Sequence, residues 1–270
     1  MIPYFQFPAL HLGPFTLQSF GLFAALGVYV AARLLVRAAR QRGLDETPVA
    51  DFAMWGLLAG LVSAHLVHLF LYHPEELRSG GLLQILKVWD GLSSMGGLLG
   101  GVLAAVVFFR ARGLSFARYA DSFALAIAPG WAIARLGCFS VHDHPGVLTN
   151  FFLAVQFPGG ARHDLGLYDA LVLFGLTLLV YGLARRELFT GQLLGVLALG
   201  YGIARFALDF LRATDVPYAD ARYFGLTPAQ YASMLLVLYG AIQLRRWARV
   251  SRQPGANSVV RNDRVPAAAA

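Results

Sequence analysis

Long apolar runs separated by short polar segments dominate the chain from residue 15 to residue 244. A helix needs about 20 consecutive apolar residues to cross the hydrocarbon core of a bilayer. Seven runs have about that length, and they cover residues 15–39, 49–72, 91–110, 119–139, 165–184, 190–212 and 226–244. The pattern predicts an all-α integral membrane protein with about seven transmembrane helices.

Arginines show which ends of the predicted helices share a side of the membrane. They gather at alternate boundaries between the runs. The four groups are Arg33, Arg37, Arg40 and Arg42; Arg110, Arg112 and Arg118; Arg185 and Arg186; and Arg245, Arg246, Arg249 and Arg252. Basic segments stay on the cytoplasmic side. We therefore expect the N-terminus outside and the C-terminus inside.

The segments outside the apolar runs suggest one domain and a tail. Residues 1–250 are expected to form a single seven-helix domain, and residues 251–270, polar and then Ala-rich, a disordered cytoplasmic tail. The segment 73–90 is expected outside, with an amphipathic piece at 82–89 lying on the membrane surface. The segment 140–164 is also expected outside, and it is rich in His, Asp and Gly.

Composition supports the membrane class and argues against nucleic-acid binding. Hydrophobic residues make up 57% of the 270 residues and charged residues only 14%, whereas soluble domains carry roughly a quarter charged residues. The net charge is +7, but the arginines stand at the ends of apolar runs, as membrane topology requires. Cys138 is the single cysteine of the chain, so an internal disulfide is excluded.

Charged residues inside membrane spans are rare and are functional candidates. Arg135 lies near the outer end of the fourth predicted span, and Arg205 and Asp209 lie in the sixth. Tyr201 shares a helical face with Arg205 and Asp209 because the three are four residues apart. Both arginines are expected at similar depth, roughly 6 and 10 Å below the outer helix ends. Two guanidiniums at one depth predict an anion site, and phosphate is the anion that membranes supply.

Two alternatives stay open for these residues. Arg205 and Asp209 could form an internal ion pair while Arg135 extends to the headgroups. Separately, the segment after the fourth span holds Cys138, His142, Asp143 and His144, with His163 further on. Cys138 and a histidine could form a nucleophilic pair, and His142, Asp143, His144 and His163 could form a metal site. We favour a polar cluster at the mouth of the bundle.

Four motifs, in this order and spacing, resemble one known family. They are GLSSMGGLLGG at 91–101, ARLGCF at 134–139, RHDLGLYD at 162–169 and YGIARFALDFLR at 201–212. Together they resemble prolipoprotein diacylglyceryl transferase, and the likeness extends over residues 12–244. That resemblance implies the same seven spans and the same orientation.

The resemblance also implies an activity, its partners and its residues. The family moves the diacylglyceryl group of phosphatidylglycerol to the lipobox cysteine of a prolipoprotein, in the outer leaflet of the bacterial cytoplasmic (inner) membrane. No metal, organic cofactor or nucleic acid is implied. The expected catalytic residues are Arg135, Arg205, Asp209, His142, Asp143 and His144. The expected substrate-binding residues are Arg135, Gly137, Tyr201, Arg205, His163 and Tyr168.

The chain departs from the family pattern at several positions. Met95 stands where the family has a histidine, Cys138 where it has an asparagine, and Phe20 where it has a tyrosine. Methionine cannot accept a proton, so a histidine of the 140–164 segment, His142 or His144, would have to replace that group. The alternative function is a catalytically inactive or altered-specificity lipid-binding membrane paralogue.

Overall fold

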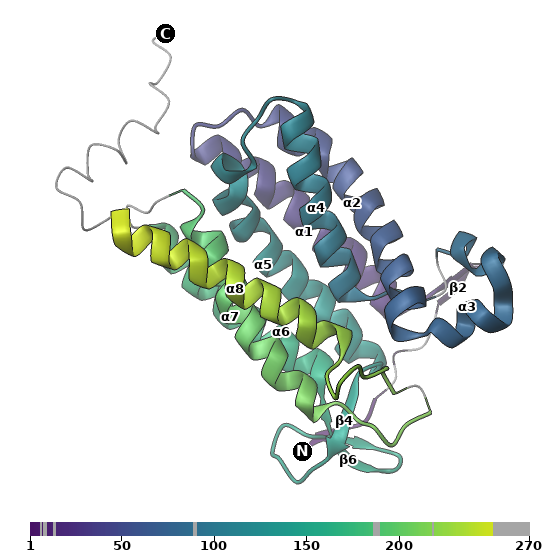
Figure 1. Ribbon diagram of the computed structural model, residues 1–270. Coiled ribbons are helices and arrows are strands. Elements are labelled where there is room, and N and C mark those ends of the chain that lie inside the picture. Colours follow the sequence, from purple (N-terminus) through teal and green to yellow (C-terminus); the bar gives the residue numbers. More distant parts are fainter. Residues whose placement is uncertain are drawn as a thin grey trace, which may run out of the picture.

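The computed structural model describes residues 1–5, 7, 10–12, 15–88, 91–185, 190–217 and 219–250. Seven long helices run alternately up and down in one bundle (Figure 1). They are α1 (Ser19–Gln41), α2 (Thr47–Val67), α4 (Ser94–Ala111), α5 (Phe116–Val141), α6 (Leu165–Ala184), α7 (Gln192–Leu208) and α8 (Pro228–Val250). Short helical segments are η1 (His68–Tyr72), α3 (Pro74–Gly80), η2 (Gly81–Leu86) and η3 (Asp209–Leu211).

Each predicted apolar run corresponds to one of the long helices, which confirms the all-α membrane class. Within the described residues, six helices are long and apolar enough to cross a membrane, α1, α2 with η1, α4, α5, α6 and α7 with η3. Large apolar side chains such as Leu58, Leu103 and Leu178 are exposed on outer faces, as contact with lipid requires. α8 is not in this set, and its sequence holds polar residues such as Gln230, Gln243 and Arg245. The count of seven spans and the orientation stay predictions.

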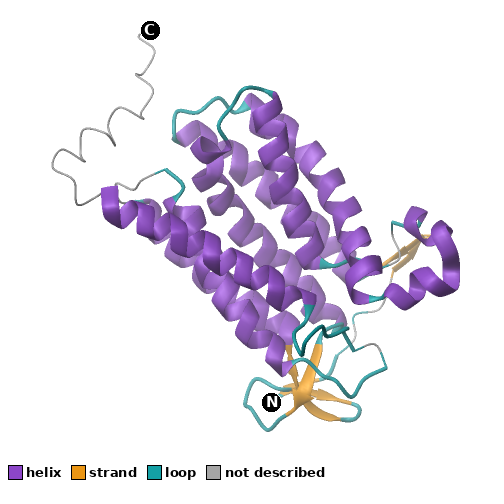
Figure 2. Cartoon of the chain, in the orientation of Figure 1, coloured by secondary structure: helices purple, strands orange, loops and turns teal. Residues whose placement is uncertain are grey.

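A small sheet caps one end of the bundle, and the sequence pattern did not predict it. Strands β1 (Ile2–Pro3), β5 (Val155–Phe157), β6 (Gly160–Asp164) and β4 (Pro145–Leu148) pair in that order. β1 is parallel to β5, and the other neighbours are antiparallel. Figure 2 shows the sheet beyond the helix ends, and we call this the head end of the bundle.

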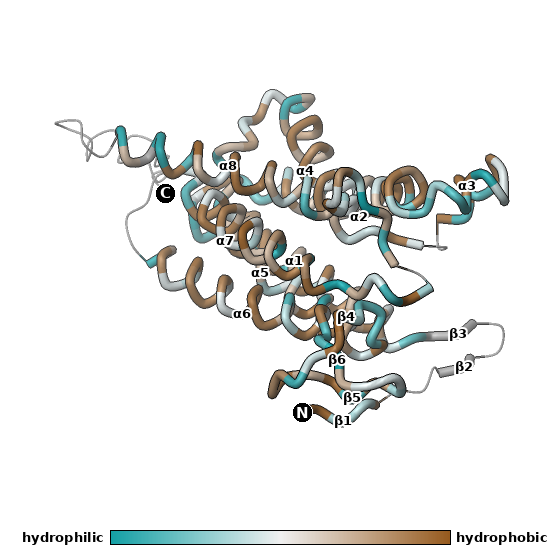
Figure 3. The backbone as a smooth tube through the Cα atoms, turned by 60° about the horizontal axis from the view of Figure 1, so that its bottom comes forward, coloured by the Kyte–Doolittle hydropathy of each residue, from teal (hydrophilic) through white to brown (hydrophobic). Residues whose placement is uncertain are grey.

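A second pair of strands and the segment around α3 complete the fold. β2 (Leu10–Leu12) and β3 (Phe15–Leu17) form an antiparallel pair, so the first helix begins at Ser19, later than predicted. Residues 74–86 extend to one side of the bundle (Figure 3), and Leu82, Leu83 and Leu86 are exposed on η2. Their position at the membrane surface stays a prediction. Trp89 and the predicted tail, residues 251–270, lie outside the described residues.

Glycines bring the helices into close contact. A Cβ at Gly130 of α5 would lie 2.6 Å from the carbonyl oxygen of Gly27 in α1. A Cβ at Gly96 of α4 would lie 2.9 Å from the Ser63 carbonyl oxygen in α2, and Ser63 donates a hydrogen bond of 2.9 Å to the Gly96 carbonyl. Small residues let membrane helices approach closely enough for such backbone contacts. The backbones of α1 and α5, and those of α2 and α4, therefore pack closely at these glycines.

A buried carboxylate joins three helices at the end opposite the head. Asp121 of α5 accepts hydrogen bonds from the backbone N–H groups of Gly191 and Leu193, at 3.0 and 2.8 Å. It also pairs with Arg42, just after α1, at 2.9 Å. A carboxylate at a helix N-terminus satisfies free N–H groups and the positive end of the helix dipole. Asp121 therefore sets where α7 begins against α5.

We expect Asp121→Ala to lower the free energy of unfolding by about 3 kcal/mol, because a guanidinium and several N–H groups lose their partner. The measurement is thermal and chemical unfolding of the purified protein in detergent. Arg40→Ala is the control, since Arg40 pairs with Glu46 at the surface and its removal should leave the unfolding midpoint nearly unchanged. Equal losses in the two variants would contradict the role of Asp121.

Candidate active site at the head end of the bundle

Two arginines from different helices meet at one carboxylate inside the bundle. Arg135 of α5 donates from Nη2 to Oδ2 of Asp169 in α6, and Arg205 of α7 donates from Nη1 to the same oxygen at 3.0 Å. The Arg135 and Arg205 side chains are 1% and 2% exposed. The structure thus brings the two predicted arginines to one level. Arg135 does not extend to the surface as the alternative reading supposed.

Asp209 continues this network toward the head end. Arg205 Nη2 lies 2.9 Å from Asp209 Oδ1, so the internal pair of the alternative reading is present. Thr227, just before α8, donates its hydroxyl to Asp209 Oδ2. Arg212 lies 3.8 Å from Asp209 and pairs with Asp220 at 2.7 Å. The charges of these arginines are matched by those of Asp169, Asp209 and Asp220, which is the condition for burying them.

Two cavities adjoin the network and differ in their chemistry. One of about 490 Å³ runs between α1, α2, α4 and α5 and is lined mainly by Ala, Gly, Leu and Phe, with Arg135 at its polar end. The other, of about 200 Å³, is lined by polar groups that include Arg205, Arg212 and Asp220. Apolar pockets with a few convergent polar groups are typical ligand sites. The pair of cavities suits a molecule with long apolar chains and a charged headgroup.

Asp143 and His144 line both cavities and mark the junction between them. His144 Nδ1 lies 2.9 Å from Asp143 Oδ1. Burial alone would raise the pKa of the Asp143 carboxyl, but the His144 imidazole and the Arg135 and Arg212 guanidiniums lower it below its ordinary value. Asp143 is therefore an anion at neutral pH.

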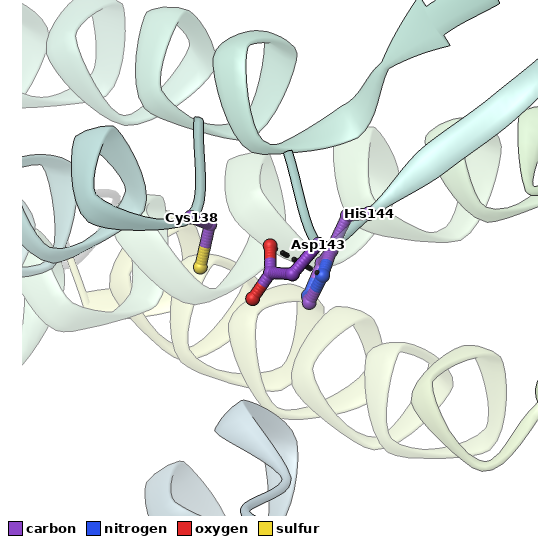
Figure 4. A group of neighbouring side chains, drawn as sticks. All are labelled: Cys138, Asp143 and His144. Atoms are coloured by element: carbon purple, nitrogen blue, oxygen red, sulfur yellow. Dashed lines mark ion pairs between the residues drawn. The ribbon is translucent and has the colours of Figure 1, made fainter. Parts of the chain in front are cut away.

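Cys138 adjoins this pair on the last turns of α5. Figure 4 shows its thiol beside Asp143 and His144, which lie on the segment leading from α5 to the sheet. Arg135 Nη1 donates to Cys138 Sγ at 3.3 Å, and the cysteine is buried. The ligand atoms of Cys138, Asp143 and His144 all lie within 4.8 Å of one another.

The other predicted histidines lie elsewhere in the head. His142 Nδ1 is bonded to Asp164 at 2.6 Å, and its ring contacts four aromatic rings, those of Tyr4, Phe5, Phe139 and Phe157. His142 has a left-handed backbone, φ +51, which turns its side chain away from that of its neighbours. It lines neither of the two cavities.

His163 and Tyr168, both predicted to bind substrate, contact each other instead. His163 Nδ1 lies 2.9 Å from the Tyr168 hydroxyl, and burial lowers the pKa of His163. Neither residue lines the two cavities. Gly137 faces α1, where a Cβ would come within 2.9 Å of Phe23, so it permits helix packing. The roles of these three in substrate binding stay predictions.

Met95 and Tyr201 pack together under the arginine network. Met95 is 2% exposed and belongs to an apolar cluster with Tyr201, Ala132 and Leu173. The Tyr201 ring also contacts that of Trp131, with the ring centroids 5.2 Å apart and the planes tilted by 49°. The position where the family has a histidine therefore holds a buried apolar side chain that lines neither cavity. This position supplies no proton acceptor.

Sequence reasoning missed Asp169, although it is central to the site. Asp169 stands in the apolar run 165–184, so the rule that selected Arg135 and Arg205 also applies to it. It also ends the RHDLGLYD motif. Arg212 and Asp220 gave no comparable signal, because Arg212 is the last residue of the apolar run 190–212 and Asp220 follows it. Only the fold brings them to the cavity.

Comparison with known proteins returns the family that the four sequence motifs resemble. A family model described as prolipoprotein diacylglyceryl transferase matches residues 8–246. A protein of Chromohalobacter salexigens named phosphatidylglycerol–prolipoprotein diacylglyceryl transferase is 32% identical over 252 residues, which cover 91% of this chain and 92% of its own. A protein of Geobacillus kaustophilus with the same name is 33% identical over 264 residues, covering 90% and 95%.

We expect Asp169→Asn to lower the free energy of unfolding by about 3–5 kcal/mol, because two buried guanidiniums lose their shared anion. Unfolding in detergent, followed by heat and by denaturant, measures this. Asp215→Asn is the matched control, since Asp215 is an exposed carboxylate that pairs with Arg162. A midpoint for Asp169→Asn equal to that of the control would refute the bridging role.

Proposed function

This chain belongs to the prolipoprotein diacylglyceryl transferase family, and on that premise we propose that it transfers the diacylglyceryl group of phosphatidylglycerol to the lipobox cysteine of a prolipoprotein. We place the reaction at the outer leaflet of the bacterial cytoplasmic membrane. The observation that carries the proposal is the pair of buried guanidiniums between an apolar and a polar cavity.

The lipid is assigned to the two cavities by their chemistry. The acyl chains fit the apolar cavity between α1, α2, α4 and α5, and the phosphoglycerol headgroup extends toward the polar cavity beyond Arg205. The phosphate then lies at the arginine level. Asp169 occupies one side of each guanidinium, but the buried Nε–H groups of Arg135 and Arg205 have no hydrogen-bond partner among the described residues. These donors are available to phosphate oxygens.

The reaction is a substitution at a glycerol carbon. The sulfur of the lipobox cysteine, as thiolate, attacks the carbon that carries the phosphate ester, and the carbon–oxygen bond breaks. Glycerol phosphate leaves with a second negative charge. Preorganised guanidiniums stabilise that developing charge where no water competes for it. Asp169 holds both guanidiniums in place, so no reorganisation is needed at the moment of reaction.

We assign activation of the thiol to Asp143 and His144. They lie at the junction of the cavities, where the lipid headgroup and an incoming peptide would meet. Met95 offers no proton acceptor, and His142 is bonded to Asp164 outside both cavities. A general base or an equivalent group raises the rate of such reactions by roughly 10²–10⁴-fold.

We expect Arg135→Ala and Arg205→Ala each to lower the transfer rate by about 100-fold or more, because each removes a donor to the leaving phosphate. The assay is transfer of labelled diacylglyceryl from phosphatidylglycerol to a lipobox peptide by the purified protein. Arg112→Ala, at the opposite end of the bundle, is the matched control and should retain the parent rate. Full turnover by either of these two variants would contradict the assignment of Arg135 and Arg205 to the phosphate site.

We expect His144→Ala to lower the transfer rate by about 100-fold or more with little change in stability, because the imidazole is partly exposed at the cavity junction. His142→Ala is the comparison. It should mainly lower the unfolding midpoint, because its ring is bonded and packed in the head. Loss of transfer in a stable His142→Ala variant, with His144→Ala active, would reverse the two roles.

A further inference from the structure

Three side chains that are typical metal ligands converge at the cavity junction. Cys138, Asp143 and His144 each offer one ligand atom, and these atoms lie within 4.8 Å of one another (Figure 4). Cysteine, carboxylate and imidazole are the ligands that zinc takes in proteins. Within the described residues, no other group of three such side chains comes as close together.

The spacing suits one small ion. Zinc lies about 2.0–2.2 Å from nitrogen and oxygen ligands and about 2.3 Å from sulfur, so tetrahedral ligand atoms are roughly 3.3–3.7 Å apart. Shifts of about an ångström in the side chains would bring the three atoms to that separation. His144 Nδ1 lies 2.9 Å from Asp143 Oδ1, yet this buried nitrogen has no partner of hydrogen-bond geometry among the described residues.

The residues around these three side chains leave a path for an ion and hold the cysteine sulfur in place. All three residues line the apolar cavity, and Asp143 and His144 also line the polar one, so a hydrated ion can enter by the polar side. Arg135 donates a hydrogen bond to Cys138 Sγ at 3.3 Å, as groups around ligating atoms commonly do. The Arg135 charge is offset by Asp169. A thiolate and a carboxylate then balance the two charges of the ion.

We propose that Cys138, Asp143 and His144 bind a zinc ion whose fourth position takes the thiol of the lipobox cysteine. This proposal rests on the proposed function, and it specifies how the Asp143–His144 pair activates the thiol. Catalytic zinc sites typically have three protein ligands and one open position. A thiol that coordinates zinc is deprotonated outright.

The substrate thiol binds the ion and gives its proton to water in the polar cavity. The zinc-bound thiolate donates an electron pair to the glycerol carbon, forming the carbon–sulfur bond. The electron pair of the breaking carbon–oxygen bond passes to the phosphate, which leaves as glycerol phosphate with two negative charges beside Arg135 and Arg205. The thioether product is neutral and is a weaker ligand, so it leaves the ion.

The test uses the full-length protein purified in detergent without chelator. Metal content is measured by mass spectrometry, and the zinc is then replaced by Co²⁺, whose thiolate bond gives a charge-transfer absorption that zinc lacks. We expect about one ion per chain in the parent and in His163→Ala. Cys138→Ser and His144→Ala should lose the ion, and Cys138→Ser should lose the cobalt–thiolate band.

The transfer assay tests whether the bound zinc ion takes part in catalysis. We expect chelation to lower the rate by about 100-fold or more, and zinc to restore it. Full transfer by the metal-free protein, or by Cys138→Ser, would overturn the zinc role while leaving the transferase function standing. A parent without the cobalt–thiolate band would overturn the site itself, and this readout needs neither activity nor a variant that folds. A zinc-loaded protein that binds cobalt but transfers nothing would instead defeat the proposed function.

Discussion

The arrangement of the site depends on the Asp169 carboxylate, which binds two guanidiniums inside an apolar bundle. Removing an ion from water into a low-dielectric interior carries a penalty of several kcal/mol, and only close, matched partners offset it. Arg135, Asp169 and Arg205 come from α5, α6 and α7, so their pairing fixes the relative heights of those helices. A shift of one helical turn along any of them, about 5.4 Å, would separate the charges. The depth of the anion site is therefore set by the requirement that buried charges be paired.

The opposite end of the bundle is held by the same kind of interaction. Asp121 joins α5 to the N-terminus of α7 and to Arg42. Between these two charged levels, α1 contacts α5 through glycine backbones. Lipid tails are as apolar as leucine, so apolar contact alone would not select one register between membrane helices. Buried ion pairs at both ends and small residues between them select one register of the helices. The apolar cavity lies between α1, α2, α4 and α5.

The helices and the arginine pair could be predicted from the sequence, because the bilayer imposes a minimum length on apolar runs and makes internal charges rare. The same rule would have identified Asp169 had it been applied to the first turns of the fifth run. The head sheet could not be predicted in this way, since strands of two to five residues are too short to show an alternating pattern. Nor could the sequence separate His142 from His144. The left-handed backbone at residue 142 sends one imidazole into an aromatic cluster, and the other lies at the cavity junction.

Met95 shows how the site can change while its electrostatics stay the same. The arginine network depends on charge balance among α5, α6 and α7, and the apolar Met95 is uncharged and packs in the cluster that contains Tyr201. A histidine at that position could therefore be lost without leaving a buried charge unpaired. The thiol must still be ionised where the headgroup and peptide meet, and that place is lined by the segment after α5. Stabilisation of the leaving phosphate and activation of the thiol thus depend on different elements. The two arginines stabilise the phosphate, and Cys138, Asp143 and His144 can activate the thiol.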